Sequence, residues 1–229
     1  MNTLLIFAKE PQQAKQRLRR SLPGAQVTRL ASAFLRDTLA LAAMLEDVVV
    51  KLAFSPRSSE PKFSGYLKEF ALEVPHGLVR QRGRALGARL EAAFKDAFAE
   101  GAHRVIAIGT DSPSMPAETI RAGFRLLKEC DCVLGPALDG GYYLIGLSQQ
   151  CPHVFRGIEW CSQSVYRDTV DIIRRRGAAY RELPVWYDVD AAEDLEFLVR
   201  DINQFRLSGD EHRARHTEDV LAKILQVDS

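Results

Sequence analysis

The chain has 229 residues, enough for one α/β domain with a substantial core, and no linker rich in proline, serine or glycine divides it. Its 31 lysines and arginines nearly balance 30 acidic residues, so the net charge of +1 argues against nucleic acid or an anionic membrane surface as a partner. The apolar run at residues 3–8 is too short for a signal peptide or a membrane span. We therefore expect one domain over residues 1–229, a cytoplasmic location and a small-molecule substrate.

Apolar runs alternate along the chain with segments of helical periodicity. The clearest helix carries an apolar stripe that includes Leu86, Leu90 and Phe94 and stops at Gly101. This alternation predicts a mostly parallel sheet with helices on both faces, which is a three-layer α/β/α sandwich. The expected strands are 4–8, 48–54, 105–108, 132–135 and 142–147, and the expected helices are 27–45, 86–98, 116–129, 162–176, 191–203 and 218–225.

The first expected strand ends in a loop that bears several cations. Lys9, Lys15 and Arg17 follow the carboxyl end of this strand, where ammonium and guanidinium groups suit the phosphates of a nucleotide. The alternative is a basic surface loop that binds no ligand. Neither Gly-x-Gly-x-x-Gly nor a Walker-type Gly-Lys-Ser/Thr occurs here, which argues against classical dinucleotide binding and P-loop chemistry.

The strand at 105–108 leads directly into Gly109-Thr110-Asp111-Ser112-Pro113. Ligands of α/β sheets gather outside the carboxyl ends of the strands, and an acid held there by turn residues is a candidate metal ligand. Asp111 is therefore our first functional candidate. The alternative is that Asp111 caps the helix expected near Pro116 or anchors the turn.

Four cysteines lie in the second half of the chain, at Cys130, Cys132, Cys151 and Cys161. The Cys-x-Cys spacing on an expected strand places the small side chains of Cys130 and Cys132 on one face, because strand side chains alternate with a period of two. We interpret the cysteines as buried thiols rather than as a structural zinc site.

Asp139, Gly140 and Gly141 connect the strands expected at 132–135 and 142–147. The connection is too short for a crossover helix, so it predicts an antiparallel or bent element within a mixed sheet. On these residues alone we favour a hairpin turn. The alternative is a ligand lying against the glycine backbone with Asp139 accepting hydrogen bonds from its hydroxyl groups.

Asp188 and Asp190 flank one apolar residue just before an expected helix. Carboxylates delivered from two loops suit Mg²⁺ or Mn²⁺, which take oxygen ligands and share them with substrate phosphates. Asp111 and Asp190 would then bridge a diphosphate through one ion. The structural alternative is a capping box formed by Asp190 and Glu193.

Taken together, the segments 9–18, 108–113, 135–143, 155–160 and 188–195 resemble a bacterial family of nucleotide-diphospho-sugar transferase-like proteins, which includes radical-SAM/selenodomain-associated and arsenosugar-pathway glycosyltransferases. The resemblance spans nearly the whole chain. It implies the glycosyltransferase-A fold, transfer from a nucleoside-diphosphate sugar to an unidentified small acceptor, and Mg²⁺ or Mn²⁺ held by Asp111, Asp188 and Asp190. The residues that it places at the nucleotide, donor or acceptor are Lys9, Lys15, Arg17, Leu86, Gly87, Thr110, Asp139, Gly140, Gly141 and Tyr142.

The chain departs from the family pattern at Gln16, where a threonine normally follows the lysine, at Ala85, where an acid normally precedes Leu-Gly, and at Ala191, where a threonine is common. Its short loop from Lys9 to Leu18 is similar to that of phospholactate guanylyltransferases, which share the fold and transfer a nucleotidyl group. The alternatives to sugar transfer are therefore nucleotidyl transfer from a nucleoside triphosphate to a small phosphorylated acceptor, or nucleotide binding without turnover.

Overall fold

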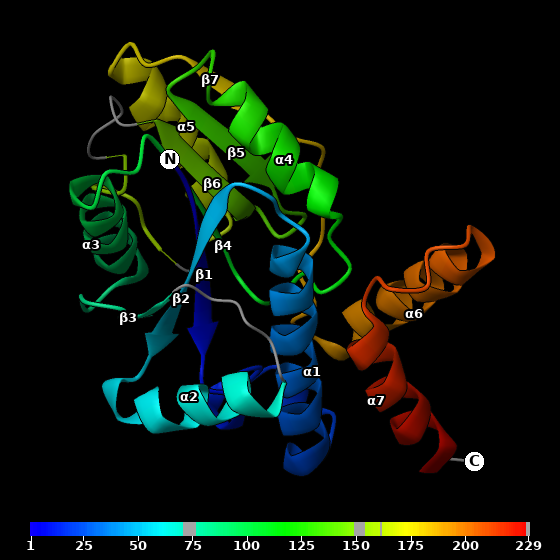
Figure 1. Ribbon diagram of the computed structural model, residues 1–229. Coiled ribbons are helices and arrows are strands. Elements are labelled where there is room, and N and C mark those ends of the chain that lie inside the picture. The colour runs from blue at the N-terminus through cyan, green and yellow to red at the C-terminus, as the bar shows by residue number, and fades with distance from the viewer. Residues whose placement is uncertain (71–76, 149–153, 161, 228–229) are drawn as a thin grey trace.

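The computed structural model describes residues 1–70, 77–148, 154–160 and 162–227 (Figure 1). Seven strands form one sheet in the order β3-β2-β1-β4-β6-β5-β7. The strands are β1 (Asn2–Lys9), β2 (Val48–Ser55), β3 (Gly77–Arg80), β4 (Arg104–Ile108), β5 (Cys132–Pro136), β6 (Tyr142–Ser148) and β7 (Tyr180–Glu182). The α-helices are α1 (Gly24–Ala43), α2 (Glu60–Glu69), α3 (Leu86–Ala99), α4 (Ala117–Leu126), α5 (Val165–Arg175), α6 (Ala192–Leu207) and α7 (Arg215–Val227).

The sheet is mixed, as the short connection through Asp139 predicts. β1 pairs in parallel with β2 and β4, whereas β6 lies antiparallel between β4 and β5. All five expected strands and all six expected helices are present, with ends shifted by a few residues. Within the described residues, the strands β3 and β7 and the α-helix α2 were not predicted.

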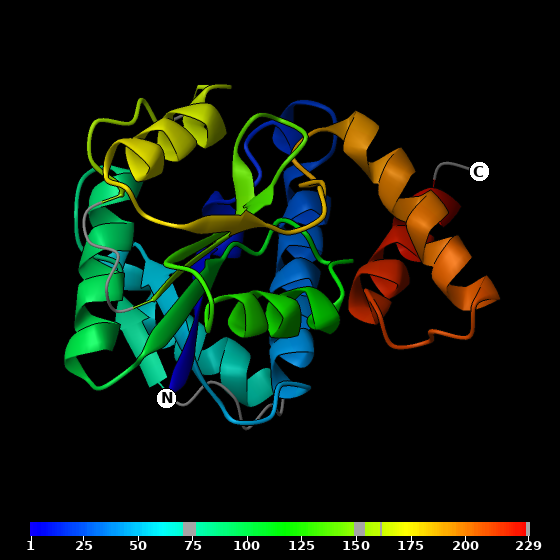
Figure 2. The ribbon, with the colours of Figure 1, turned by 90° about the horizontal axis from the view of Figure 1, so that it is seen from above.

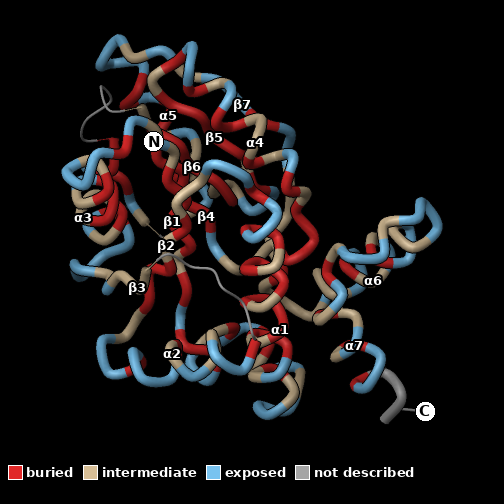
Figure 3. Tube along the Cα trace, viewed as in Figure 1, coloured by how far each residue is buried: buried red, intermediate tan, exposed pale blue. Residues whose placement is uncertain are grey.

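The two faces of the sheet are covered by different helices, which confirms the three-layer sandwich (Figure 2). Alternate side chains of β1 divide between the layers: Leu4 and Ile6 pack with α1, α2 and α4, whereas Leu5 packs with α3 and α5. Figure 3 shows the resulting buried core along the central strands. Because parallel strands here are buried on both faces, they read as continuous apolar runs in the sequence.

Helices α6 and α7 form a hairpin beside α1, on the side away from α3 (Figure 1). Leu30 and Phe34 of α1 pack against Leu198 of α6 and Leu221 of α7. The C-terminal helix therefore packs on α1 and α6 of the same chain. Among the described residues, no helix is long and apolar enough to cross a bilayer.

The cysteines that the structure describes, Cys130 and Cys132, are both buried thiols. The prediction that they share one face is wrong: Cys130 precedes β5 and packs in the layer of α1 and α4, whereas Cys132 packs in the layer of α3 and α5. Cys151 and Cys161 lie outside the described residues.

A buried carboxylate, Asp37 of α1, holds the first turn of α7. It accepts hydrogen bonds from the backbone N–H of His216 (3.0 Å), the backbone N–H of Thr217 (2.8 Å) and the Thr217 hydroxyl (2.6 Å). Burial raises the pKa of Asp37 to about 6, although these three donors act in the opposite direction. Asp37 therefore satisfies donors that the start of a helix otherwise leaves without partners.

We expect Asp37→Ala to lower the free energy of unfolding by about 2–4 kcal/mol, because it leaves several donors without an acceptor at a buried contact. Urea denaturation of both proteins measures the difference. Asp219→Ala is the matched control, since Asp219 is exposed on α7, the helix that Asp37 holds. A loss no greater for Asp37→Ala than for the control contradicts the assigned role.

Candidate functional site

The acidic segments that precede α4 and α6 lie together at the carboxyl edge of the sheet. The backbone N–H of Val189 donates to the backbone carbonyl of Asp111 (2.8 Å), which ties the two segments to each other. Val189 itself is buried against α1. Asp111, Asp188 and Asp190, far apart in the sequence, are thereby brought into one region.

Lys15 reaches into this region from the loop after β1. Its ammonium forms an ion pair with Asp111, lies 3.2 Å from Asp190 Oδ1 and donates to the Val189 carbonyl (2.6 Å). The Lys15 side chain is only 3% exposed, whereas those of Asp111 and Asp190 are 45% and 39% exposed. Burial opposes the charged ammonium, but Asp111 and Asp190 outweigh it and raise the pKa of Lys15. The site therefore contains a buried ammonium group, that of Lys15, whose positive charge is stabilised by the carboxylates of Asp111 and Asp190.

The backbone around Lys15 is shaped for this contact. Lys15 has a φ of 55°, a left-handed conformation that is uncommon for a lysine. Arg19 fixes the loop by donating to the carbonyls of Pro11 and Ala14 and to the Thr28 hydroxyl, at 2.9–3.0 Å. Arg19 therefore stabilises the conformation of this loop, a role that was not predicted from the sequence.

The other two cations proposed for this loop lie at its surface. Lys9, the last residue of β1, and Arg17 are both exposed. Neither is drawn into the cluster around Lys15. Both remain accessible to a ligand that approaches the same edge of the sheet.

Asp188 is the most perturbed acid of the site. The Ser112 hydroxyl donates to Asp188 Oδ1 (2.5 Å). Burial, followed by repulsion from Asp111, raises the pKa of Asp188 to about 7, and Asp139 acts in the same direction. Asp111 and Asp188 therefore form a pair with excess negative charge, which a bound cation would relieve.

Two oxygen-donor carboxylates fit Mg²⁺ or Mn²⁺, since Mg²⁺ is commonly held by one or two carboxylates, with substrate phosphates and water completing its shell. Within the described ranges, no three His, Cys, Asp or Glu side chains form a ready-made metal site. The residues thus fit an ion that arrives with a phosphorylated ligand. The Lys15 ammonium lies between Asp111 and Asp190, so of the possible pairs Asp111 and Asp188 are the better suited.

The capping alternatives do not account for these acids. The residue before α4 is Pro116, and no side-chain hydrogen bond caps that helix start. The alternative of a capping box between Asp190 and Glu193 is contradicted: Asp194 Oδ2 accepts from the backbone N–H groups of Asp190 and Ala191, both at 2.8 Å. The helix begins one residue later than the spacing suggested, which leaves the Asp190 carboxylate facing Lys15.

Asp139, Gly140 and Gly141 form the favoured turn between β5 and β6. Asp139 Oδ1 accepts from the Gly141 N–H (2.9 Å), and Gly140 has a φ of 89°. A Cβ atom on Gly140 would lie 2.2 Å from the Gln163 carbonyl oxygen, so glycine is required there. The turn also starts β6 and so places Tyr142 beside the acidic region.

A pocket of about 260 Å³ opens next to Asp111 and Asp188. We call it the β4 pocket, because Ala107, Ile108 and Gly109 form its floor. Its remaining lining residues are Phe7 of β1, Leu86 and Leu90 of α3, and Tyr142, Tyr143 and Ile145 of β6. The structure thus places Leu86 and Tyr142 in the same pocket as Asp111 and Asp188.

Gly87 and Thr110 are not among the residues that line the β4 pocket. A Cβ atom on Gly87 would lie 2.4 Å from Trp160 Nε1, so this glycine allows the 154–160 segment to pack closely on α3. Thr110 is half-buried between β4 and Asp111. For Gly87 the structure therefore shows a packing requirement.

Two features at the same edge were missed in the sequence. Gln81, just after β3, donates from its side-chain amide to the carbonyls of Ala8 (3.2 Å) and Ala53 (2.8 Å), and so bridges the ends of β1 and β2. The buried Glu10 accepts hydrogen bonds from Ser59 and Lys62. No sequence signal marked either residue, because neither β3 nor α2 was predicted.

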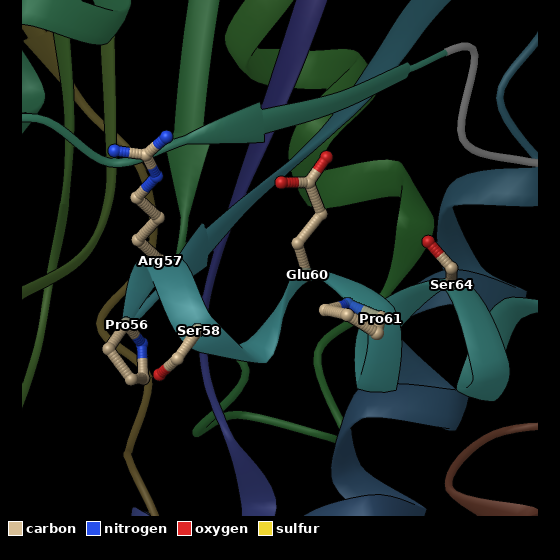
Figure 4. A pocket seen from close by; sticks show the side chains of 6 residues that line it. All are labelled: Pro56, Arg57, Ser58, Glu60, Pro61 and Ser64. Atoms are coloured by element: carbon tan, nitrogen blue, oxygen red, sulfur yellow. The ribbon is translucent and has the colours of Figure 1, made fainter.

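A wider depression of about 830 Å³ lies at the end of β2 (Figure 4). Figure 4 shows the side chains of Arg57 and Glu60 rising on the same side of this segment. None of the three acids near Lys15 lines it. We therefore assign the chemistry to the β4 pocket and its carboxylates rather than to this larger hollow.

Comparisons with known proteins identify the family and the fold. A family model described as "Uncharacterized protein conserved in bacteria (DUF2064)" matches residues 38–162. A solved structure from Desulfovibrio desulfuricans G20, described as a "putative nucleotide-diphospho-sugar transferase", is 32% identical, with 97% of this chain and 94% of that chain covered and a TM-score of 0.86. No curated protein matches the sequence significantly.

More distant structures share the fold alone. The 4-diphosphocytidyl-2C-methyl-D-erythritol synthase of Anaerococcus prevotii is 10% identical over 86% of this chain and 93% of its own, with a TM-score of 0.58. A nucleotidyl transferase from Methanothermobacter is 13% identical over 89% and 99%, with a TM-score of 0.55. The expected nucleotide-diphospho-sugar transferase fold is confirmed.

Proposed function

Because the chain belongs to the bacterial family DUF2064 and has the fold of nucleotide-diphospho-sugar transferases, we propose that it is a metal-dependent transferase that uses a nucleoside-diphosphate sugar. One observation carries most weight: Lys15 and three aspartates from two distant segments meet at the carboxyl edge of the sheet. Ligands of open α/β sheets bind at this edge. A buried cation beside paired carboxylates suits a ligand that brings both phosphates and a metal ion.

In this proposal Asp111 and Asp188 hold Mg²⁺ or Mn²⁺, and Asp190 keeps Lys15 in place. An ion held there would offset the negative charge that develops on the departing diphosphate. Lys9 and Arg17, exposed at the same edge, bind phosphate oxygens, for which Arg offers a two-pronged contact. Lys15 supplies a fixed positive charge that needs no rearrangement during the reaction.

The second candidate is nucleotidyl transfer from a nucleoside triphosphate to a small phosphorylated acceptor. The specific observation in its favour is the short loop from Lys9 to Leu18, which resembles the loop of phospholactate guanylyltransferases. Pyrophosphate would be the leaving group instead of a nucleoside diphosphate. The identity of the released phosphate compound therefore distinguishes the two reactions.

The test is a thermal-shift and calorimetry panel of UDP-, GDP-, dTDP- and CDP-sugars and of nucleoside triphosphates, each with and without Mn²⁺. A ligand at 100 times its dissociation constant stabilises the native state by about 2.7 kcal/mol. We expect metal-dependent stabilisation by one nucleotide-sugar. A preference for a triphosphate favours nucleotidyl transfer, binding without product indicates a protein that has lost turnover, and no response to any compound contradicts the proposal.

A further inference from the structure

Most of the residues that line the β4 pocket are apolar, and its charged groups lie together. Phe7, Leu86, Leu90 and Ile145 give it apolar walls, and Asp111 and Asp188 stand together among its lining. Leu86 is 45% exposed although it is a large apolar residue. The pocket therefore offers hydrocarbon surface over most of its lining and charged oxygen atoms in one place.

The two tyrosines of the pocket add little polarity to it. The Tyr143 hydroxyl donates to the Pro184 carbonyl (2.9 Å), so its proton is not available for a hydrogen bond to a ligand. The Tyr142 hydroxyl oxygen is buried within the protein and presents no accessible surface to a ligand. Ala107 and Ile108 on the floor pair with β1 and β6 as part of the sheet ladder. Apart from Asp111 and Asp188, the described lining thus offers few groups that a ligand can hydrogen-bond.

This lining disfavours a sugar ring. Each sugar hydroxyl that enters the pocket loses its hydrogen bonds to water, and a buried hydroxyl left without a partner costs on the order of 1–3 kcal/mol. A hydrocarbon group has no such cost and gains from burial against the walls. The volume of about 260 Å³ exceeds the roughly 150 Å³ of an engineered protein cavity that binds benzene. A compact apolar group somewhat larger than one ring fits this space.

We propose that the β4 pocket is the acceptor subsite and that it selects an alcohol with a compact apolar body. This inference rests on the proposed function, since it assigns the second substrate of the same site. The apolar body lies against Phe7, Leu86 and Leu90, and its hydroxyl points toward Asp111 and Asp188. The hydroxyl oxygen forms the new bond to the sugar, the bond from sugar to diphosphate breaks with its electron pair leaving on the diphosphate, and the hydroxyl proton passes to solvent.

The first experiment compares benzyl alcohol with glycerol as probes of the wild-type protein, by calorimetry and by ligand-observed NMR, with and without the nucleotide-sugar and Mn²⁺. We expect benzyl alcohol to bind at least tenfold more tightly than glycerol. We also expect it to accelerate release of nucleoside diphosphate from the donor. Equal binding of the two probes, or tighter binding of glycerol, overturns the inference.

Leu86→Ala tests whether the probe occupies this pocket. Leu86 opens α3 at a partly exposed position, so its replacement leaves the core intact. We expect this variant to bind benzyl alcohol about tenfold more weakly than the wild type does. Leu207→Ala is the matched control, because Leu207 is 84% exposed on α6 and lies outside the pocket. Equal effects of the two variants overturn the assignment to the β4 pocket.

The nucleotide response separates failure of this inference from failure of the proposed function. If nucleotide-sugars bind with metal but glycerol outcompetes benzyl alcohol, the apolar acceptor is wrong and the transferase proposal stands. If benzyl alcohol binds and Leu86→Ala weakens it while no nucleotide binds, the apolar subsite is supported and the proposed function fails.

Discussion

Replacing Lys15 with methionine is expected to lower the free energy of unfolding by about 1.5–3 kcal/mol, because it removes the buried charged donor to the Val189 carbonyl and to two half-exposed carboxylates. The Lys15 side chain is 3% exposed and its ammonium contacts Asp111, Asp190 and the Val189 carbonyl. Methionine has a similar length, so the change removes charge with little loss of volume. The same variant should lose metal-dependent binding of the nucleotide, since three acids then face the phosphates without their buried cation.

Chemical denaturation measures the stability loss, and calorimetry at a temperature where the variant remains folded measures the binding loss. Arg125→Met is the matched control, because Arg125 pairs with Glu118 at the surface and both side chains are 60% exposed. Such an exposed pair contributes at most about 1 kcal/mol. A loss for Lys15→Met as small as that of the control contradicts the structural role given to Lys15.

A double-mutant cycle sharpens the result. Asp111→Asn removes the charge that Lys15 contacts while keeping the shape of the side chain. If the two groups act as a pair, Lys15→Met in the Asp111→Asn background should cost clearly less than in the wild type. Additive losses would show that Lys15 stabilises the fold through its contacts with Asp190 and Val189 instead.

The strands next to this site could be predicted from the sequence, but the contacts between its side chains could not. β1 and β4 are continuous apolar runs buried on both faces, so their carboxyl ends, and with them Asp111, were predictable. β3 was not, because its four residues, Gly77–Arg80, show neither alternation nor a long apolar run. Gln81, which depends on the position of β3, was missed for the same reason.

The difference between Lys15 and its neighbours also could not be read from residue types. Lys9, Lys15 and Arg17 are equally plausible phosphate ligands in the sequence. Only the left-handed backbone at Lys15 and the loop staple by Arg19 turn Lys15 inward while Lys9 and Arg17 stay at the surface. Spacing alone does not report such a local backbone conformation.

The alternative of a capping box between Asp190 and Glu193 failed for a similar reason. A capping box depends on which residue is the first with helical dihedrals, and a shift of one residue exchanges Glu193 for Asp194 as the acid that closes it. The consequence is functional, because it leaves the carboxylate of Asp190 available to Lys15. Helix boundaries are thus the weak point of a site prediction that relies on acids next to a helix start.

The last prediction concerns Asp188, where stability and function should change in opposite directions. Burial and the charge of Asp111 raise the pKa of Asp188 from 3.8 to about 7. A folded-state pKa above the unfolded value means that the folded protein binds more protons between these values, so stability falls as the pH rises from about 4 to 7. Asparagine cannot ionise, and its carbonyl still accepts the hydrogen bond from Ser112.

We therefore expect Asp188→Asn, measured in EDTA at pH 8, to raise the free energy of unfolding by on the order of 2–4 kcal/mol, at about 1.36 kcal/mol per pKa unit. The advantage over the wild type should shrink toward pH 4, where Asp188 is protonated in the wild type. Turnover should fall by about 100-fold or more, since one of the two carboxylates assigned to the metal is lost.

Asp171→Asn, an exposed position on α5, provides the control for an acid-to-amide change. A variant at position 188 that is less stable than the wild type at pH 8 would mean that Asp188 is ionised in the folded protein at no net cost, and the excess negative charge argued for this site would be absent. A more stable but fully active variant would instead leave the metal to Asp111 and Asp190. Only greater stability together with lost turnover fits our interpretation, in which the Asp188 carboxylate destabilises the folded protein but is required to bind the metal ion.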